Sequence, residues 1–333
     1  MHGLVLTLAV VLDWLLGEPP NALHPVAWFG QFVHALERRA PRDHPSTGSG
    51  QRPRAELLYG AGIAASGIAL ATLPALAIER LFKSRKESWL GVLVIAAALK
   101  MTFAWRALIQ AGEDVQRDLE TNETDGARAD LRALVSRDTS GLDTLSLAAA
   151  AIESLAENAS DSFIAPLLYY QLFGLPGAFA YRAVNTLDAM IGYHGRYEFL
   201  GKIPARLDDV VNWIPSRLTA LLFVIASRFA GANSRRAWET MRRDHAKTAS
   251  PNAGYPMSAM AGALDVRLEK VGHYCLNDAG RAPCPGDIRR AARMVSLALW
   301  LGVAASVLIV QLNRKSEIEN LKSEIKNAHS TTP

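Results

Sequence analysis

Charged residues are scarce in this sequence: they make up 20% of its 333 residues, against about 25% in typical soluble domains. Neither sign dominates, because 36 lysines and arginines accompany 32 aspartates and glutamates in mixed order, and no basic stripe for nucleic acid is present. Aromatic residues reach only 8%, whereas apolar residues make up half of the chain. This composition excludes a disordered, collagen-like or coiled-coil protein. The mean hydropathy of +0.07 favours membrane spans separated by substantial polar loops.

Cysteine is almost absent too. Cys275 and Cys284 stand nine residues apart, which fits neither a CxxC redox pair nor a paired zinc-ligand set. We interpret both as structural residues in a reducing compartment. The N-terminus lacks the charged region and small-residue cleavage site of a signal peptide, and its apolar run continues as far as Leu16. We therefore expect a retained anchor rather than a cleaved leader.

Long uncharged stretches are the main signal in the chain, because a hydrocarbon core about 30 Å thick needs about 20 mostly apolar helical residues. The firmest are Leu57 to Ile78, Ser162 to Tyr181 and Met294 to Asn313. Weaker candidates are Met1 to Leu16, Ser88 to Trp105 with Lys100 inside, and Val210 to Ser227 with Arg217 inside. The sequence predicts an all-α, polytopic integral membrane protein with four to six transmembrane helices and long polar, partly helical loops. The second firm span is interrupted at Pro166 and at Gly174 to Gly177.

The polar segments differ in charge. Residues 79–87 and 228–293 are basic, which predicts a cytoplasmic position, whereas residues 106–143 carry five basic and nine acidic groups. We expect a helix from Ala107 to Leu134 on the solvated surface. Residues 1–313 are predicted to form a single membrane domain, and residues 314–333 a polar, dispensable tail.

Two segments approximate nucleotide-binding motifs without satisfying them. Gly60 to Ala65 fits the loose pattern GxGxxA but lies inside an apolar helix, where small residues let helices approach closely. Gly195 to Ile203 resembles a P-loop with one residue too many and isoleucine where the magnesium-binding hydroxyl belongs. We therefore predict helix packing for the first and no Walker motif in the second.

The most informative stretch runs from Ala148 to Tyr170. On a helix, Glu153, Glu157 and Asp161 would form one carboxylate stripe, with a four-residue spacing. Such a stripe between apolar flanks is costly near lipid, which makes it a candidate functional site. Magnesium is the simplest partner, since it binds carboxylates together with substrate phosphates. A solvent-facing helix at the membrane surface is the alternative.

Two further motifs flank predicted spans. Arg182, Asn185 and Asp188 follow one span, and Lys202, Arg206 and Asp208 precede another. Both motifs combine cations and carboxylates, which could hold phosphate and metal together. Ordinary anchoring at the membrane interface would place the same residue types there.

Two loops could present groups to an anion. Residues 137–143 read as a turn and helix cap, with Arg137 as a phosphate contact. Ser250 and Asn252 lie in a tight loop before an apolar helix, which could bind an anion or simply form a turn.

Together these blocks resemble the cobalamin-biosynthesis CbiB/CobD proteins, the adenosylcobinamide-phosphate synthases. The similarity runs in the family's order from about residue 3 to 310. The blocks that carry it are DWLLGEPPNALHPVAWFGQ (13–31), RDTSGLD (137–143), AIESLAENASDSFIAPLLYY (151–170), RAVNTLDAMIGY (182–193), KIPARLDDVVNWIPSRLTA (202–220) and SPNAGYPMSAMAGALDVRLEK (250–270).

The resemblance implies a multi-pass protein of the bacterial inner membrane. It also implies an amide-forming ligase that joins the propionate of adenosylcobyric acid, a corrinoid, to (R)-1-aminopropan-2-ol O-phosphate or to aminopropanol. ATP is the expected co-substrate and Mg²⁺ the expected cofactor. The resemblance implies no nucleic-acid partner and leaves open a contact with other membrane enzymes of the late cobalamin pathway.

Set against that reaction, each candidate residue has an expected role. The expected magnesium ligands are Glu153, Glu157 and Asp161, with Glu157 counted as catalytic as well. Asp188 and Asp208 are the candidate bases for the amine proton. Phosphate and substrate contacts are expected from Arg137, Arg182, Asn185, Lys202, Arg206, Ser250 and Asn252.

Two other classes of protein share parts of this pattern. A membrane prenyl- or alcohol-phosphate transferase would also place magnesium on Asp-rich helix ends. A small-molecule transporter could use the interrupted span at Gly174 to line a site in the middle of the membrane. The sequence shows neither matched aspartate repeats nor a paired set of broken helices.

Overall fold

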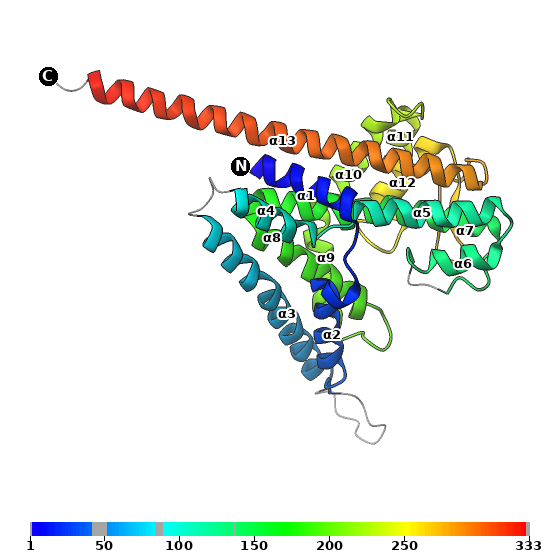
Figure 1. Ribbon diagram of the computed structural model, residues 1–333. Coiled ribbons are helices and arrows are strands. Elements are labelled where there is room, and N and C mark those ends of the chain that lie inside the picture. The colour runs from blue at the N-terminus through cyan, green and yellow to red at the C-terminus, as the bar shows by residue number, and fades with distance from the viewer. Residues whose placement is uncertain (1, 42–51, 84–88, 136–137, 331–333) are drawn as a thin grey trace.

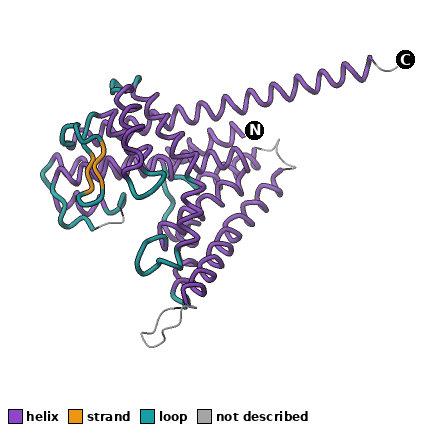
Figure 2. The backbone as a smooth tube through the Cα atoms, turned by 180° about the vertical axis from the view of Figure 1, so that it is seen from behind, coloured by secondary structure: helices purple, strands orange, loops and turns teal. Residues whose placement is uncertain are grey.

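The computed structural model describes residues 2–41, 52–83, 89–135 and 138–330, which are helical apart from loops and one small antiparallel hairpin (Figures 1 and 2). In chain order the elements are α1 (His2–Leu16), the 3₁₀ turn η1 (Asn21–Leu23), α2 (Pro25–Glu37), α3 (Arg52–Lys83), α4 (Trp89–Lys100), α5 (Trp105–Glu120), α6 (Thr124–Leu131), α7 (Thr144–Ala159), the π-helical turn η2 (Ser160–Ile164), α8 (Ala165–Ile191), α9 (Lys202–Val211), α10 (Trp213–Ser227), α11 (Ser234–Asp244), the 3₁₀ turn η3 (His245–Lys247), α12 (Gly254–Leu264), β1 (Leu268–Lys270), β2 (Tyr274–Leu276) and α13 (Pro285–Ser330). The predicted all-α class is confirmed.

Four helical stretches in the described ranges are long and apolar enough to cross a membrane: Pro53–Phe82, Trp89–Glu120, Thr144–Ile191 and Pro285–Leu312. The pair Lys202–Val211 and Trp213–Ser227 makes a fifth if its 45° bend is counted within one span, and Gly3–Leu16 is a shorter apolar helix. This agrees with the predicted four to six. Two of the three firm sequence candidates fall inside these spans, and the third, Met294 to Asn313, overlaps Pro285–Leu312 up to Leu312.

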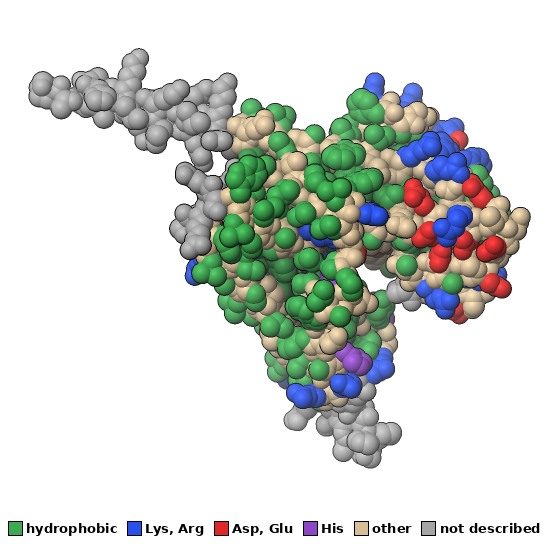
Figure 3. All heavy atoms as spheres, viewed as in Figure 1, with side chains coloured by type: hydrophobic (Ala, Val, Ile, Leu, Met, Phe, Trp, Pro, Cys, Tyr) green, Lys and Arg blue, Asp and Glu red, His purple; other side chains and the backbone are tan. Residues whose placement is uncertain are grey.

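The outer surface of the spans is apolar. The most apolar stretch of 18 residues in Pro53–Phe82 is only 22% buried inside the protein, and so is the corresponding stretch in Pro285–Leu312. Hydrophobic side chains cover the broad face over α1, α4 and α8, whereas charged side chains gather at the end formed by α5 and α6 (Figure 3). A large exposed apolar face next to a charged end is the division expected of a protein embedded in a bilayer.

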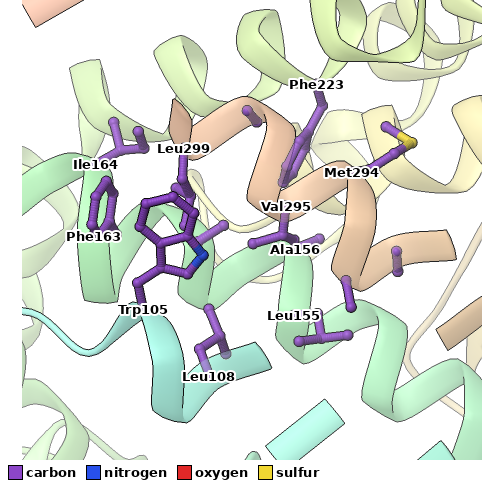
Figure 4. Packing of buried hydrophobic residues seen from close by; sticks show 14 of the residues in the cluster. Trp105, Leu108, Leu155, Ala156, Phe163, Ile164, Phe223, Met294, Val295 and Leu299 are labelled. Atoms are coloured by element: carbon purple, nitrogen blue, oxygen red, sulfur yellow. The ribbon is translucent and has the colours of Figure 1, made fainter. Parts of the chain in front are cut away.

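The core forms where α5, α7, η2, α10 and α13 meet (Figure 4). Trp105 is fully buried there, and its ring lies edge-on to Phe163 and Trp300 at centroid distances of 5.1 and 4.9 Å. Edge-to-face pairs stabilise a core beyond the area they bury. This packing fixes η2, which carries Asp161, against the centre of the protein.

The predicted interruption of the second firm span is confirmed. Gly174 adopts φ 70° and ψ −161° inside α8, a conformation that side chains with a Cβ rarely adopt. Glu79 of α3 accepts a hydrogen bond from the freed backbone N–H of Leu175 at 3.0 Å. A side chain of the neighbouring helix therefore accepts the hydrogen bond that the break leaves without a partner in α8, as backbone groups at membrane depth require.

The acidic segment forms two helices rather than the single surface helix predicted for Ala107 to Leu134. A turn at residues 121–123 separates α5 from α6, and Leu108, Val115 and Leu119 bury one face of α5 against the protein. Its apolar residues recur at helical spacing and so form a stripe that packs inward.

The predicted cap is confirmed: Asp143 accepts a hydrogen bond from the N–H of Ser146 at 2.8 Å where α7 begins.

The glycine-rich segment of α3 approaches the turn before α9 at Gly60, and its Ile63 and Ala64 share a buried hydrophobic cluster with α8, in agreement with the helix-packing interpretation. A Cβ on Gly60 would overlap the carbonyl oxygen of Leu200, whereas a Cβ on Gly62 would meet nothing within 4 Å. We expect Gly60→Ala to lower stability by about 1–3 kcal/mol through overpacking and Gly62→Ala to change it little. Thermal unfolding of the two variants in detergent checks this, and equal stability would contradict the close approach.

Asp244 holds the hairpin region together. Its side chain is fully buried and accepts hydrogen bonds from the Arg243 guanidinium and from the N–H of Asn277 at 2.7 Å, and it forms an ion pair with Lys247 at 2.9 Å. Burial opposes ionisation, but hydrogen bonds from Arg243, Lys247 and Asn277 outweigh it and lower the pKa of Asp244 from 3.8 to about 2.

A carboxyl group whose pKa is depressed on folding stabilises the protein above its unfolded pKa, and that contribution is lost as the pH falls through the folded pKa. We expect Asp244→Asn to cost about 2 kcal/mol at pH 7. The difference in stability between wild type and variant should shrink between pH 4 and pH 2. Unfolding curves in detergent at several pH values measure it, and a difference independent of pH would contradict the assignment.

The final helix continues past the predicted end of the membrane domain. α13 runs unbroken to Ser330 and extends away from the rest of the protein (Figure 1). The predicted tail is therefore helical in backbone as far as the structure describes it. Its dispensability stays a prediction.

Candidate active site

Asn185 of α8 joins two carboxylates from different elements. Its side-chain nitrogen lies 3.4 Å from Oδ2 of Asp161, on η2, and 3.5 Å from Oδ1 of Asp208, on α9. Residues from three of the blocks singled out in the sequence thus meet at one point.

A second set of polar side chains orients Asp208. Asn212 donates to Oδ2 of Asp208 at 2.9 Å, and the buried hydroxyl of Tyr181 donates to Oδ1 of Asn212 at 2.8 Å. Tyr169 also donates to the carbonyl of Val211 at 3.0 Å. These bonds tie α9 to α8, so the Asp208 carboxylate keeps one orientation toward Asn185.

Negative charge is concentrated around this point. Asp161 experiences repulsion from Asp208, Glu157 and Asp188, and attraction from Arg182. Carboxylates gathered in a poorly solvated place repel one another unless protons or cations offset them. The arrangement therefore has the charge to attract a cation.

The chemistry of these donors fits Mg²⁺, which prefers hard oxygen ligands and usually takes one or two carboxylates together with water and substrate phosphates. Asp161 and Asp208 are the carboxylates that share a partner. Within the described ranges, no three His, Cys, Asp or Glu side chains converge closely enough to form a metal site by themselves. A magnesium ion here would need ligands from a bound substrate.

The predicted single carboxylate stripe is divided in the structure. Glu153 and Glu157 line a cavity of about 170 Å³ with Lys270 and Tyr274, whereas Asp161 contacts Asn185. The cause is η2, because a π-helical turn accommodates an extra residue and changes the direction of the side chains that follow. Glu157 connects the two groups through its electrostatic interaction with Asp161.

The predicted cations are distributed unevenly. Arg182 lies beside the cluster, with Nη1 3.5 Å from Oδ1 of Asn185. Lys202 and Arg206 are exposed on α9, and Arg206 pairs with Asp209 at 3.4 Å. Arg137 lies outside the described residues.

Ser250 and Asn252 have contacts that position a loop. The Ser250 hydroxyl accepts hydrogen bonds from the N–H groups of Asn252 and Ala253, both at 3.2 Å. Asn252 is buried and donates to the carbonyl of Asp209 at 2.8 Å. The loop is thereby fixed to the α9–α10 junction, close in the chain to Asp208.

A third polar group, formed by Asp13, Glu18, His24 and Lys100, was not among the predicted site residues, and His24 was expected only to pack or to form a hydrogen bond. Lys100 is only 3% exposed and forms ion pairs with Glu18 and, at 3.1 Å, with Asp13, which is fully buried. Glu18 and His24 line a cavity together with Arg182. The available signal was the single lysine inside an otherwise apolar span, since an ionisable residue at membrane depth marks a functional site by default.

The fold and the site define a multi-pass helical membrane protein with a carboxylate-rich centre between α8, α9 and η2. The chain belongs to the CobD/Cbib protein family, whose model matches residues 6–301. It is 42% identical over 311 residues to the cobalamin biosynthesis protein CobD of Dehalococcoides mccartyi (strain CBDB1), covering 93% of this chain and 98% of the relative.

Archaeal relatives are similar over the same length. The probable cobalamin biosynthesis protein CobD of Methanothermobacter thermautotrophicus is 40% identical over 92% of this chain and 98% of its own. The corresponding protein of Pyrococcus abyssi is 40% identical over 93% of this chain and 97% of its own. No solved structure matches the chain. The family resemblance drawn from the sequence blocks is confirmed.

Proposed function

We propose that this protein acts in cobalamin biosynthesis as an ATP-dependent amide ligase. It would join the propionate of adenosylcobyric acid to (R)-1-aminopropan-2-ol O-phosphate and release ADP and phosphate. The observation that carries the proposal is the meeting of Asp161 and Asp208 at Asn185 beside Arg182, in a chain whose relatives are named cobalamin biosynthesis proteins.

An unactivated carboxylate resists attack by an amine, so the reaction needs two steps. In the first, a propionate oxygen attacks the γ-phosphorus of ATP, the bond from that phosphorus to the β–γ bridging oxygen breaks, ADP leaves, and an acyl phosphate forms. In the second, the amine nitrogen attacks the acyl carbon, phosphate leaves, and the nitrogen gives up a proton. Phosphoryl transfer of this kind depends mainly on positioning and charge neutralisation.

The chain supplies groups for both steps. Asp161 and Asp208 would hold Mg²⁺, which supplies charge neutralisation on the transferring phosphoryl group when bound. Arg182 would contact a substrate phosphate, since guanidinium groups bind phosphate strongly. Asp188, on α8 one turn beyond Asn185, would accept the amine proton. Lys202 and Arg206, which are exposed, would contact a soluble nucleotide from outside the cluster.

The test uses the full chain purified in detergent. We expect incubation with adenosylcobyric acid, aminopropanol phosphate, ATP and Mg²⁺ to give the amide by mass spectrometry, with one ADP released per amide. The control omits either the amine or ATP. Absence of the amide, together with ATP-independent transport of a corrinoid into liposomes, would contradict the ligase proposal and favour a transporter.

A further inference from the structure

The cavity lined by Glu18, His24 and Arg182 lies between the segment that follows α1 and the start of the second half of α8. It has a volume of about 350 Å³, and its polar lining also includes Asn21. This volume is at the lower end of the range for ligand pockets, about 300–1,000 Å³. The cavity suits a small substrate better than a corrinoid. Arg182 connects it to the carboxylate centre through Asn185.

Glu18 is held in this cavity as a charged group. Lys100 donates to one of its oxygens and forms an ion pair with it, and Nε2 of His24 lies 2.8 Å from the other. Nδ1 of His24 accepts a hydrogen bond from the N–H of Val26 at 3.1 Å. Because Nδ1 is the acceptor, the ring proton is on Nε2, which donates to Glu18.

The environment of Glu18 also favours ionisation. Burial raises the pKa of Glu18, but hydrogen bonds from His24 and Lys100 and the charge of Lys100 outweigh it, and the pKa lies below its ordinary value. A carboxylate has about four acceptor sites. Two donors therefore leave Glu18 able to accept a further hydrogen bond from a ligand.

Arg182 brings the opposite charge to the same cavity. Among the residues that the structure describes, its guanidinium donates one hydrogen bond, from Nη1 to Asn185 at 3.5 Å, and its Nε has no hydrogen-bond partner. It is electrostatically attracted to both Glu18 and Asp161. A guanidinium with most of its five donors unused can bind an anion such as phosphate.

Apolar side chains also line the cavity, among them Val26, Ala27, Met101 and Phe103. A carboxylate, a guanidinium and an apolar wall in one small cavity are complementary to a small zwitterion with an ammonium group, a short carbon chain and a phosphate. We propose that this cavity binds the amine substrate, an amino alcohol phosphate, with Glu18 contacting the ammonium group and Arg182 the phosphate. This inference rests on the proposed ligase function.

The experiment separates the two contacts with three probes: aminopropanol phosphate, aminopropanol, and propanediol phosphate, in which a hydroxyl replaces the amine. Calorimetry with the full chain in detergent measures their binding, and steady-state kinetics gives KM for the amine, ATP and the corrinoid. We expect Glu18→Gln to weaken binding of both amines by about tenfold or more and to leave propanediol phosphate unchanged. Arg182→Gln should weaken binding of the two phosphorylated probes by a similar factor and leave binding of aminopropanol unchanged.

The matched control is Glu198→Gln. Glu198 also pairs with a histidine, His194, at 2.8 Å, but both side chains are exposed and lie outside this cavity. It should leave all three affinities unchanged. If Glu18→Gln fails to fold, Arg182→Gln still tests the inference through its unequal effect on phosphorylated and unphosphorylated amines.

The outcomes distinguish the two proposals. Equal effects of Glu18→Gln and Arg182→Gln on all three probes, or larger effects on KM for ATP or the corrinoid than for the amine, would overturn the assignment of this cavity. Failure of the wild type to bind aminopropanol phosphate would overturn it as well. Failure to form the amide despite selective binding of the zwitterion would overturn the ligase reaction and leave the cavity assignment supported.

Discussion

Asp208→Asn is expected to reduce amide formation by about 10²–10³-fold while the protein still folds. The substitution keeps the shape of the side chain and one of its two acceptor oxygens, so it can still accept a hydrogen bond from Asn185 or from Asn212. It removes one of the two negative charges that meet at Asn185 and so weakens the proposed attraction for Mg²⁺. The loss should appear mainly in kcat, because the charge acts on the transferring phosphoryl group.

The neighbouring residue provides the control. Asp209 differs from Asp208 in its contacts, since its carboxylate pairs with the exposed Arg206 at 3.4 Å. Asp209→Asn should therefore retain activity within a few-fold of wild type. Rates of amide formation are measured over a range of magnesium concentrations. Wild-type activity of Asp208→Asn at every concentration would remove this residue from the active site.

Lys100→Met is expected to destabilise the protein by about 3–5 kcal/mol, the usual cost of removing one partner from a buried ion pair. Lys100 is 3% exposed, and it forms ion pairs with Glu18 and with the fully buried Asp13. Methionine fills a similar volume but leaves two carboxylates without their shared cation. Desolvated negative charges without a partner are strongly unfavourable.

Unfolding in detergent, followed by a fluorescent or thermal probe, measures this effect. Lys202→Met is the control, because that lysine is exposed on α9 and its loss should change stability by no more than about 0.5 kcal/mol. Adding Asp13→Asn to Lys100→Met should recover part of the loss, since it removes one of the stranded charges. Equal stability of Lys100→Met and wild type would show that the buried pairs do not form in the folded protein.

Local chemistry determined the membrane-spanning helices. Leu57 to Ile78 lies inside a span and Met294 to Asn313 overlaps one up to Leu312, because uncharged runs of that length can satisfy their backbone groups in lipid only as helices. The break at Gly174 and the cap at Asp143 were predictable because both are local. The break depends on the backbone conformation that glycine allows at its own position, and the cap depends on a side chain that accepts a hydrogen bond from the N–H group three residues later.

The site was predictable only in part. The blocks containing Asp161, Asn185 and Asp208 were identified as candidates, and the structure brings these three side chains together. The division of the carboxylate stripe could not be predicted from helical spacing, because one π-helical turn changes the direction of every side chain beyond it. The pairing of Lys100 with Glu18, 82 residues apart, has no local signature.

The sequence by itself therefore determined the all-α membrane class, the spans and the family, since these depend on hydrophobic runs and on contiguous motifs. Only the tertiary structure decided which motifs share a site. Asp161, Asn185 and Asp208 meet because α8 and α9 pack together and Tyr181 and Asn212 hold them in register. Glu18 and Arg182 share a cavity for the same kind of reason. Contacts between distant segments depend on how helices pack in three dimensions, and spacing along one helix carries no information about them.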